Sequence, residues 1–132
     1  MRVVLDTNIL ISGIFFHGTP GKILDAWVND DFSIFVTPEI LDEYSEVILR
    51  LATPKSEELA FEWLNMLFGL CHIMPGSNET LSYCRDPKDD KFIDCALSAK
   101  ANYLVSGDMD LLVVSQKLPF EIISARKFLS SI

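Results

Sequence analysis

The chain has 132 residues, of which 49% are hydrophobic, and this excludes an intrinsically disordered chain. Its 19 Asp and Glu residues outnumber its 11 Lys and Arg residues, and the net charge of −8 argues against a broad, non-specific DNA-binding surface. No apolar run approaches the ~18 residues of a transmembrane helix, and we find no signal peptide, so we expect a cytoplasmic protein without membrane association. The thiols Cys71, Cys84 and Cys95 fit a reducing compartment.

The hydrophobic pattern predicts short buried strands that alternate with amphipathic helices. We expect strands at residues 2–5, 32–36, 71–74, 103–106 and 120–123. We expect helices at residues 9–15, 22–28, 38–51, 55–70, 89–100, 110–114 and 125–129, and a loop at residues 17–21. Thr7 or Asn8 is predicted to cap the first of these helices, and Thr37 the third. The alternation predicts the α/β class: a three-layer α/β/α sandwich around a mainly parallel central sheet of four to five strands, with residues 1–132 as one domain.

Acidic residues stand where a carboxylate is awkward for packing. Asp6 ends the first predicted strand, and Asp108 follows the fourth. In a parallel sheet, groups beyond the carboxyl ends of the strands gather at one edge. Glu43 shares the apolar face of its helix with the core positions around it, and Asp89 stands at the tip of another core stripe. These acids are therefore predicted to converge.

A shared cation explains such a cluster better than separate burials do. Burying one charge costs several kcal/mol unless the charge is paired or binds a metal. Neighbouring carboxylates repel each other unless a divalent cation lies between them. Each acid also has a simpler explanation by itself. Asp6 could cap the helix that follows it, and Asp89 could be an ordinary acid in the first turn of its helix. Glu43 could extend its carboxylate into solvent, and Asp108 could belong to a turn. Their joint spacing favours the metal site, and a metal site of this kind indicates work on a phosphodiester.

Taken in order, the acidic motifs resemble those of the PIN-domain family of metal-dependent ribonucleases, which includes the toxins of VapBC-type toxin–antitoxin pairs. The resemblance covers essentially the whole chain. The motifs are the strand followed by Asp6-Thr7-Asn8, the helix start from Thr37 to Glu43, the charged segment from Arg85 to Phe92, and Ser106-Gly107-Asp108 followed by Asp110. Ser106 departs mildly from the family, where Thr is commoner, and it keeps the hydroxyl.

The resemblance implies that Asp6, Glu43 and Asp108 are catalytic and metal-binding residues that use Mg²⁺ or Mn²⁺. The third acid of the family falls on Asp89 or Asp90: helix phase favours Asp89, and the separation from Asp108 in many relatives favours Asp90.

Three further residues are expected to support the site, and they are Asn8, Ser106 and Asp110. Glu43 is expected to hold a second metal ion or to orient the attacking water. Arg85, Lys88 and Lys91 flank the acidic segment and are candidates for contact with phosphates.

We therefore expect an endoribonuclease that hydrolyses single-stranded RNA as the toxin of a toxin–antitoxin pair, with an antitoxin protein and a homodimer as partners. The alternative is a non-catalytic PIN-like scaffold in an RNA or toxin–antitoxin complex. A phosphotransfer domain fits less well, because a haloacid-dehalogenase-like phosphatase needs Asp-x-Asp where this chain has Asp6-Thr7-Asn8. Trp27, Phe61 and Trp63 are candidates for a partner surface, although Trp63 lies on a core stripe.

Overall fold

A parallel sheet forms the centre of the protein. The computed structural model describes residues 1–76, 87–108, 111 and 118–132. Within them the strands are β1 (Arg2–Leu5), β2 (Ser33–Val36), β3 (His72–Ile73), β4 (Tyr103–Val105) and β5 (Glu121–Ile123). Their order is β3-β2-β1-β4-β5, and every pairing is parallel. The predicted α/β class, with its mainly parallel sheet, is confirmed.

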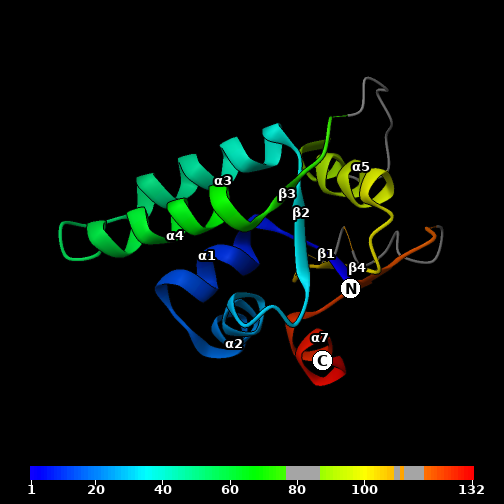
Figure 1. Ribbon diagram of the computed structural model, residues 1–132, viewed down its shortest axis with the longest axis horizontal. Coiled ribbons are helices and arrows are strands. Elements are labelled where there is room, and N and C mark those ends of the chain that lie inside the picture. Colours follow the sequence, from blue (N-terminus) through cyan, green and yellow to red (C-terminus); the bar gives the residue numbers. More distant parts are fainter. Residues whose placement is uncertain (77–86, 109–110, 112–117) are drawn as a thin grey trace.

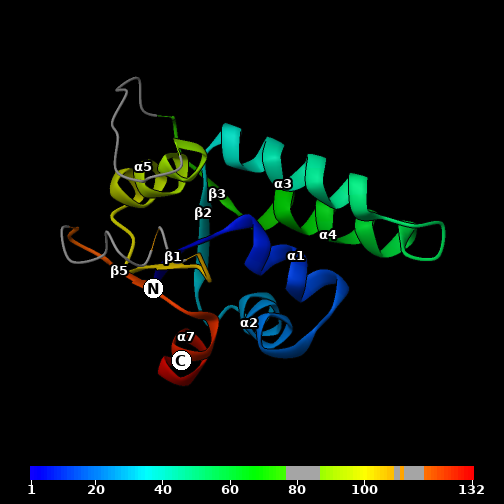
Figure 2. The ribbon, with the colours of Figure 1, turned by 180° about the vertical axis from the view of Figure 1, so that it is seen from behind.

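Helices cover both faces of this sheet. They are α1 (Thr7–Phe15), α2 (Gly18–Val28), α3 (Pro38–Leu51), α4 (Glu57–Leu70), α5 (Asp90–Ala99) and α7 (Ala125–Ser131), and the 3₁₀ turn η1 (Pro87–Asp89) precedes α5. In both views α5 lies on one side of the strands, and α1 to α4 lie on the other (Figures 1 and 2). This is the predicted three-layer arrangement.

The strand order creates a switch point between β1 and β4. The chain leaves β1 to form β2 on one side, whereas β4 pairs with β1 on the other side. In open α/β sheets, ligands bind outside the carboxyl ends of the strands at such a point, because the crossing connections diverge there and leave a crevice. Asp6 and Ser106 directly follow β1 and β4, so the topology places them at this crevice.

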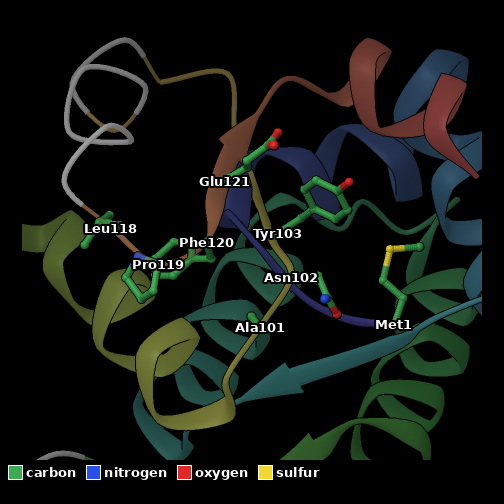
Figure 3. A pocket seen from close by; sticks show the side chains of 8 residues that line it. All are labelled: Met1, Ala101, Asn102, Tyr103, Leu118, Pro119, Phe120 and Glu121. Carbon is green, nitrogen blue, oxygen red and sulfur yellow. The ribbon is translucent and has the colours of Figure 1, made fainter.

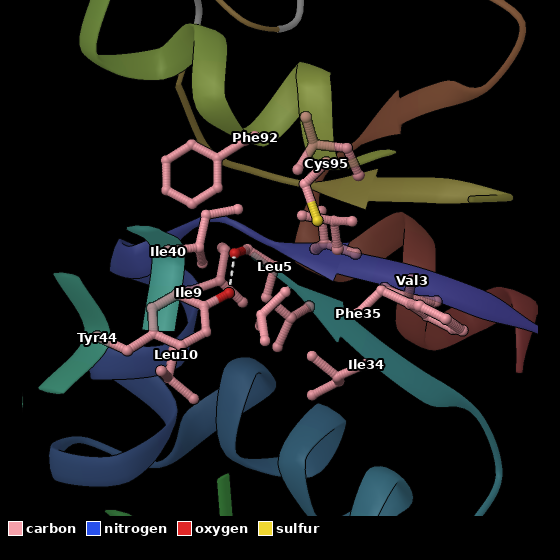
Figure 4. Close-up of a cluster of buried hydrophobic side chains, with 14 of the residues drawn as sticks. Val3, Leu5, Ile9, Leu10, Ile34, Phe35, Ile40, Tyr44, Phe92 and Cys95 are labelled. Atoms are coloured by element: carbon pink, nitrogen blue, oxygen red, sulfur yellow. Dashed lines mark hydrogen bonds between the residues drawn. The ribbon is translucent and has the colours of Figure 1, made fainter. Parts of the chain in front are cut away.

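Strand β1 lies in the hydrophobic core of the protein. Val3, Val4 and Leu5 are fully buried, as a central strand covered on both faces requires. Figure 4 shows Tyr44 from α3 reaching the end of β1, where its hydroxyl donates a hydrogen bond to the carbonyl oxygen of Leu5. This bond satisfies the polar end of a fully buried Tyr44 and ties α3 to the strand that carries Asp6.

The starts of the first two helices differ from the prediction. The cap of α1 is Asp6, whose side chain accepts from the backbone N–H of Asn8; Thr7 and Asn8, the predicted caps, already lie inside the helix. The residues predicted as a loop after position 17 form the first turn of α2, which includes Pro20. Proline is tolerated in a first helical turn because its missing N–H would have no intrahelical partner there.

A close helix contact explains one glycine. A Cβ atom at Gly13 would lie 2.6 Å from Leu24 Cδ1 and 2.9 Å from the carbonyl oxygen of Pro20. Only glycine therefore lets α1 approach α2 at this distance. This contact packs α1, which begins at the crevice, closely against α2.

The remaining predicted elements match the structure within about two residues at their ends, including the cap of α3 by Thr37. The predicted helix at residues 110–114, Asp110 included, lies outside the described residues apart from Leu111, which is buried. Among the described helices, none combines the length and the apolar character that a membrane crossing requires.

Candidate active site at the carboxyl edge of the sheet

One serine hydroxyl joins the ends of β1 and β4. Fully buried Ser106 donates from Oγ to Asp6 Oδ2 at 2.7 Å, and the same Oγ accepts from the backbone N–H of Asp108 at 2.9 Å. The backbone N–H of Asp6 donates to the carbonyl oxygen of Val105 at 3.0 Å and continues the strand pairing. The structure therefore brings Asp6 and Asp108 together, as the positions of these acids at the strand ends suggested.

Asp6 is a buried carboxylate with negative neighbours. Its exposed fraction is 5%, and burial raises the pKa of its carboxyl above the ordinary value of 3.8. Hydrogen bonds from Ser106 and from the N–H of Asn8 oppose this rise of the pKa, and the negative charges of Asp108 and Glu43 add to it. Negative charge is therefore costly at this point, and a bound cation would relieve the cost.

Glu43 is held at both of its oxygens. It lies on the second turn of α3, which Thr37 and Pro38 start directly after β2. Its Oε2 accepts from the hydroxyl of buried Thr7, and its Oε1 lies 2.7 Å from Lys91 Nζ. The sequence pointed to Glu43, but not to Thr7 as its partner.

The acids border one cavity of about 680 Å³. Its lining comprises Asp6, Thr7, Asn8, Glu43, Glu46, Val47, Arg50, Lys88, Asp89, Lys91, Phe92 and Asp108. Asp6 and Asp108 also border a neighbouring hollow of about 340 Å³, together with Asn8, Ile9, Ser12 and Gly107. Cationic and anionic side chains thus share the crevice, although the protein as a whole is acidic.

The two candidates for the third acid occupy different positions. Asp89 is the last residue of η1 and lines the cavity, whereas Asp90 begins α5 and is only 8% exposed. Asn8 approaches Asp6 through its backbone N–H, and its side chain is exposed. Asp110, the remaining predicted supporting residue, lies outside the described residues.

Arg50 and Glu46 also line the cavity, and the sequence analysis singled out neither of them. Arg50 is the basic residue of the two. It stands seven residues after Glu43 on α3, and therefore on the same helix face two turns further along. That spacing was visible in the sequence and would have identified it. Arg50 is exposed and adds positive charge at the rim of the cavity.

The donor set fits a hard divalent cation held by few protein ligands. Carboxylate oxygens are the ligands that Mg²⁺ and Mn²⁺ prefer. Across the described part of the chain, no three His, Cys, Asp or Glu side chains stand close enough together to form a ready-made metal cage. Mg²⁺ usually keeps several waters and uses one or two carboxylates, so Asp6 and Asp108 suffice in number.

A second cavity, of about 700 Å³, lies at the opposite, amino ends of β4 and β5. Figure 3 shows its lining, which includes Met1, Asn102, Tyr103 and Glu121. Glu121 is the single acid among its described lining residues. Because carboxylates gather in the first cavity and not here, we place the functional site at the carboxyl edge.

Fold and site together define an α/β sandwich with an acidic crevice at the switch point of a parallel sheet. The chain belongs to the PIN-domain family, because the family model described as PIN domain matches residues 2–110. PIN domains are generally nucleases, and PIN nucleases typically use divalent metals.

Known proteins that are similar to this chain include the following two. One is "Uncharacterized protein MJ1680" from Methanocaldococcus jannaschii, which is 31% identical over 118 residues that cover 85% of this chain and 74% of that protein. The other is a solved structure of VapBC2 from Rickettsia felis, bound to a DNA fragment from its promoter. It superposes with a TM-score of 0.63 at 16% identity and covers 94% of this chain and 98% of that one. At this identity the likeness shows the fold alone.

Proposed function

We propose that this PIN domain, with residues 1–132 as one unit, is a metal-dependent endoribonuclease that hydrolyses phosphodiester bonds of single-stranded RNA. The observation that carries the proposal is the shared hydroxyl of Ser106, which fixes the buried Asp6 next to Asp108 at the switch point. Two carboxylates held together at this cost in repulsion are expected where a cation is to be bound.

The residues divide the work as follows. Asp6 and Asp108 would hold Mg²⁺ or Mn²⁺, and Ser106 orients the carboxylate of Asp6 and holds the backbone of Asp108 beside it. When bound, the metal lowers the pKa of a water and stabilises the charge that develops on the phosphate. Arg50 and Lys88 line the same cavity and bind the phosphates of the RNA strand.

The third acid is either Asp89 or Asp90. Asp89 lines the cavity, whereas Asp90 is buried at the start of α5, and either would hold the metal directly or through water. Asn replaces either carboxylate with little change of volume, so the pair Asp89→Asn and Asp90→Asn separates the candidates. The substitution at the working ligand is expected to slow cleavage by at least tenfold more than the other.

We further propose that the protein is the toxin of a toxin–antitoxin pair in the cytoplasm, with an antitoxin protein and a second copy of the chain as partners. Exposed phenylalanines support a partner surface: Phe61 and Phe68 on α4 are 50% and 56% exposed. Trp27 does not belong to that surface, because it is 4% exposed and stacks with half-buried Trp63 at 6.5 Å between ring centroids.

The test is cleavage of a fluorescently labelled single-stranded RNA with Mg²⁺ or Mn²⁺, with and without EDTA. We expect EDTA-sensitive cleavage by the wild type and at least a hundredfold loss in Asp6→Asn, because the variant removes the charge that binds the metal. Asp25→Asn, on the exposed side of α2, is the matched control and should cleave like the wild type. Cleavage by Asp6→Asn at the wild-type rate would refute the proposal.

The alternative is a non-catalytic scaffold that keeps the acids for structure. It predicts no Mn²⁺ binding and no EDTA-sensitive cleavage by the wild-type protein, while RNA or an antitoxin still binds. Calorimetric titration with Mn²⁺ and the cleavage assay therefore separate the two functions on the same preparation.

A further inference from the structure

A lysine occupies the acidic cavity in a position that a cation would favour. Lys91 Nζ lies 2.7 Å from Glu43 Oε1, and the Lys91 side chain is only 13% exposed. The ammonium also donates to the carbonyl oxygen of Lys88 at 2.8 Å and lies 5.3 Å from the ring centroid of Phe92. A lysine usually extends its charge into water, whereas this one is held inside by three kinds of contact.

The contact leaves Glu43 paired. The hydroxyl of Thr7 donates to one carboxylate oxygen of Glu43, and Lys91 pairs with the other. A divalent ion bound to Glu43 would have to displace this ammonium or lie directly beside it, where two positive charges repel. Glu43 is thus paired with a cation of the protein itself.

We propose that the ammonium group of Lys91 takes the place of a second metal ion at Glu43. The cavity then binds one divalent ion, and this ion binds at Asp6 and Asp108. The inference rests on the proposed function and decides between the two roles considered for Glu43. Lys91 is then a positioning residue: it holds Glu43 in a fixed orientation, from which Glu43 would orient the attacking water, and it supplies positive charge without a second metal.

The location of the single metal ion follows from the neighbouring hollow. Asp6 and Asp108 border both the main cavity and the smaller hollow with Asn8 and Ser12, whereas Lys91 and Glu43 border the main cavity only. An ion in the smaller hollow would have the carboxylates of Asp6 and Asp108 at its border, and Lys91 does not line that hollow. Such an ion would also relieve the repulsion between Asp6 and Asp108, whereas Glu43 is paired with Lys91.

The test counts Mn²⁺ ions per chain by isothermal titration calorimetry on protein stripped with EDTA. Wild type should bind one ion, and Lys91→Met should bind two, because Glu43 is released from its pair. Lys91→Arg keeps the charge and should bind one. Lys22→Met removes an exposed lysine from α2 and serves as the matched control, with one ion expected. The double variant Lys91→Met with Glu43→Gln should return to one ion.

Equal counts in wild type and Lys91→Met, or two ions in the wild type, would overturn the proposal. If Lys91→Met does not fold, as judged by circular dichroism, Glu43→Gln decides: one bound ion supports the proposal, and loss of that ion overturns it. The nuclease function is judged separately by EDTA-sensitive cleavage. A wild type that binds no Mn²⁺ would overturn this proposal as well as metal-dependent cleavage. One ion in the wild type and two in Lys91→Met, without EDTA-sensitive cleavage, would support the role of Lys91 and reject the nuclease function alone.

Discussion

Replacing Ser106 by alanine tests the contact on which the site depends. Ser106 is fully buried, and its hydroxyl makes one bond to the ionised carboxylate of Asp6 and one bond from the N–H of Asp108. Ser106→Ala removes both bonds and leaves a backbone donor and a buried carboxylate oxygen without this partner. The carboxylates of Asp6 and Asp108 are then free to move apart.

The expected loss of stability follows from the two bonds. A hydrogen bond to a charged group contributes about 1.5–3 kcal/mol and a neutral one about 1 kcal/mol, so the variant should lose about 3 kcal/mol. For 132 residues, an unfolding entropy of about 2.1 cal/mol/K per residue gives roughly 280 cal/mol/K in total. The melting temperature should therefore fall by about 10 °C.

The assay is thermal unfolding followed by circular dichroism, together with Mn²⁺ titration. Affinity for Mn²⁺ should fall by about 10- to 100-fold, because a residue that orients a metal ligand is lost. Ser106→Thr keeps the hydroxyl and should recover most of both properties. Ser130→Ala removes an exposed hydroxyl, whose bond to the Lys127 carbonyl is 2.9 Å, and should change the melting temperature by less than about 2 °C.

A Ser106→Ala variant that melts within about 2 °C of the wild type and binds Mn²⁺ with equal affinity would refute this reasoning. The acids would then be held by the strands alone, and the hydroxyl would be dispensable.

Two further predictions concern charge and thiol chemistry. Arg50→Ala should raise the KM for RNA with little change of kcat, and it should reduce the slope of log affinity against log salt by about one, because one phosphate contact is lost. Arg126→Ala on α7 is the control and should leave the KM and the slope unchanged. An unchanged slope for Arg50→Ala would show that this arginine contacts no phosphate. Burial raises the pKa values of the Cys71 and Cys95 thiols to about 12. At pH 8 their alkylation by iodoacetamide, followed by mass spectrometry, should therefore be roughly a thousandfold slower in the native protein than in urea, because the thiolate is the reactive form. Rapid labelling of either thiol in the native protein would contradict this prediction.

The sequence predicted the sheet well because each strand is a short apolar run that is bounded by turn or cap residues. The prediction was incomplete or wrong where the same residue types suit two different structures or roles. Helix capping and a place in the site were treated as alternatives for Asp6, yet its carboxylate caps α1 and also lines the acidic cavity. Pro20 and its glycine neighbours were interpreted as a loop, although they form the first turn of a helix. Composition alone does not separate a turn from the first turn of a helix, because both tolerate the same residues.

The site was predictable as far as the topology determines it. Parallel strands bring their carboxyl ends to one edge, so the meeting of Asp6 with Asp108 followed from their positions in the chain. The sequence pattern does not show which side chains of different helices come into contact, and the pairing of Glu43 with Lys91 was missed for that reason. Trp27 was expected at a partner surface because its helix could not be packed in advance, and it is buried against Trp63.

The buried charge at the switch point would couple the proposed metal binding to the stability of the fold. The carboxylate of Asp6 is buried at the end of the central strand, where Asp108 and Glu43 raise its energy further. The metal-free protein therefore carries a local repulsion that the core around β1 must offset. A cation that binds only the folded chain adds stability by mass action, about 2.7 kcal/mol at a concentration 100 times its Kd. Of the two negative neighbours, Asp108 raises the pKa of Asp6 more than Glu43 does, and Glu43 is paired with Lys91, so a cation bound beside Asp6 and Asp108 would relieve the larger part of this repulsion.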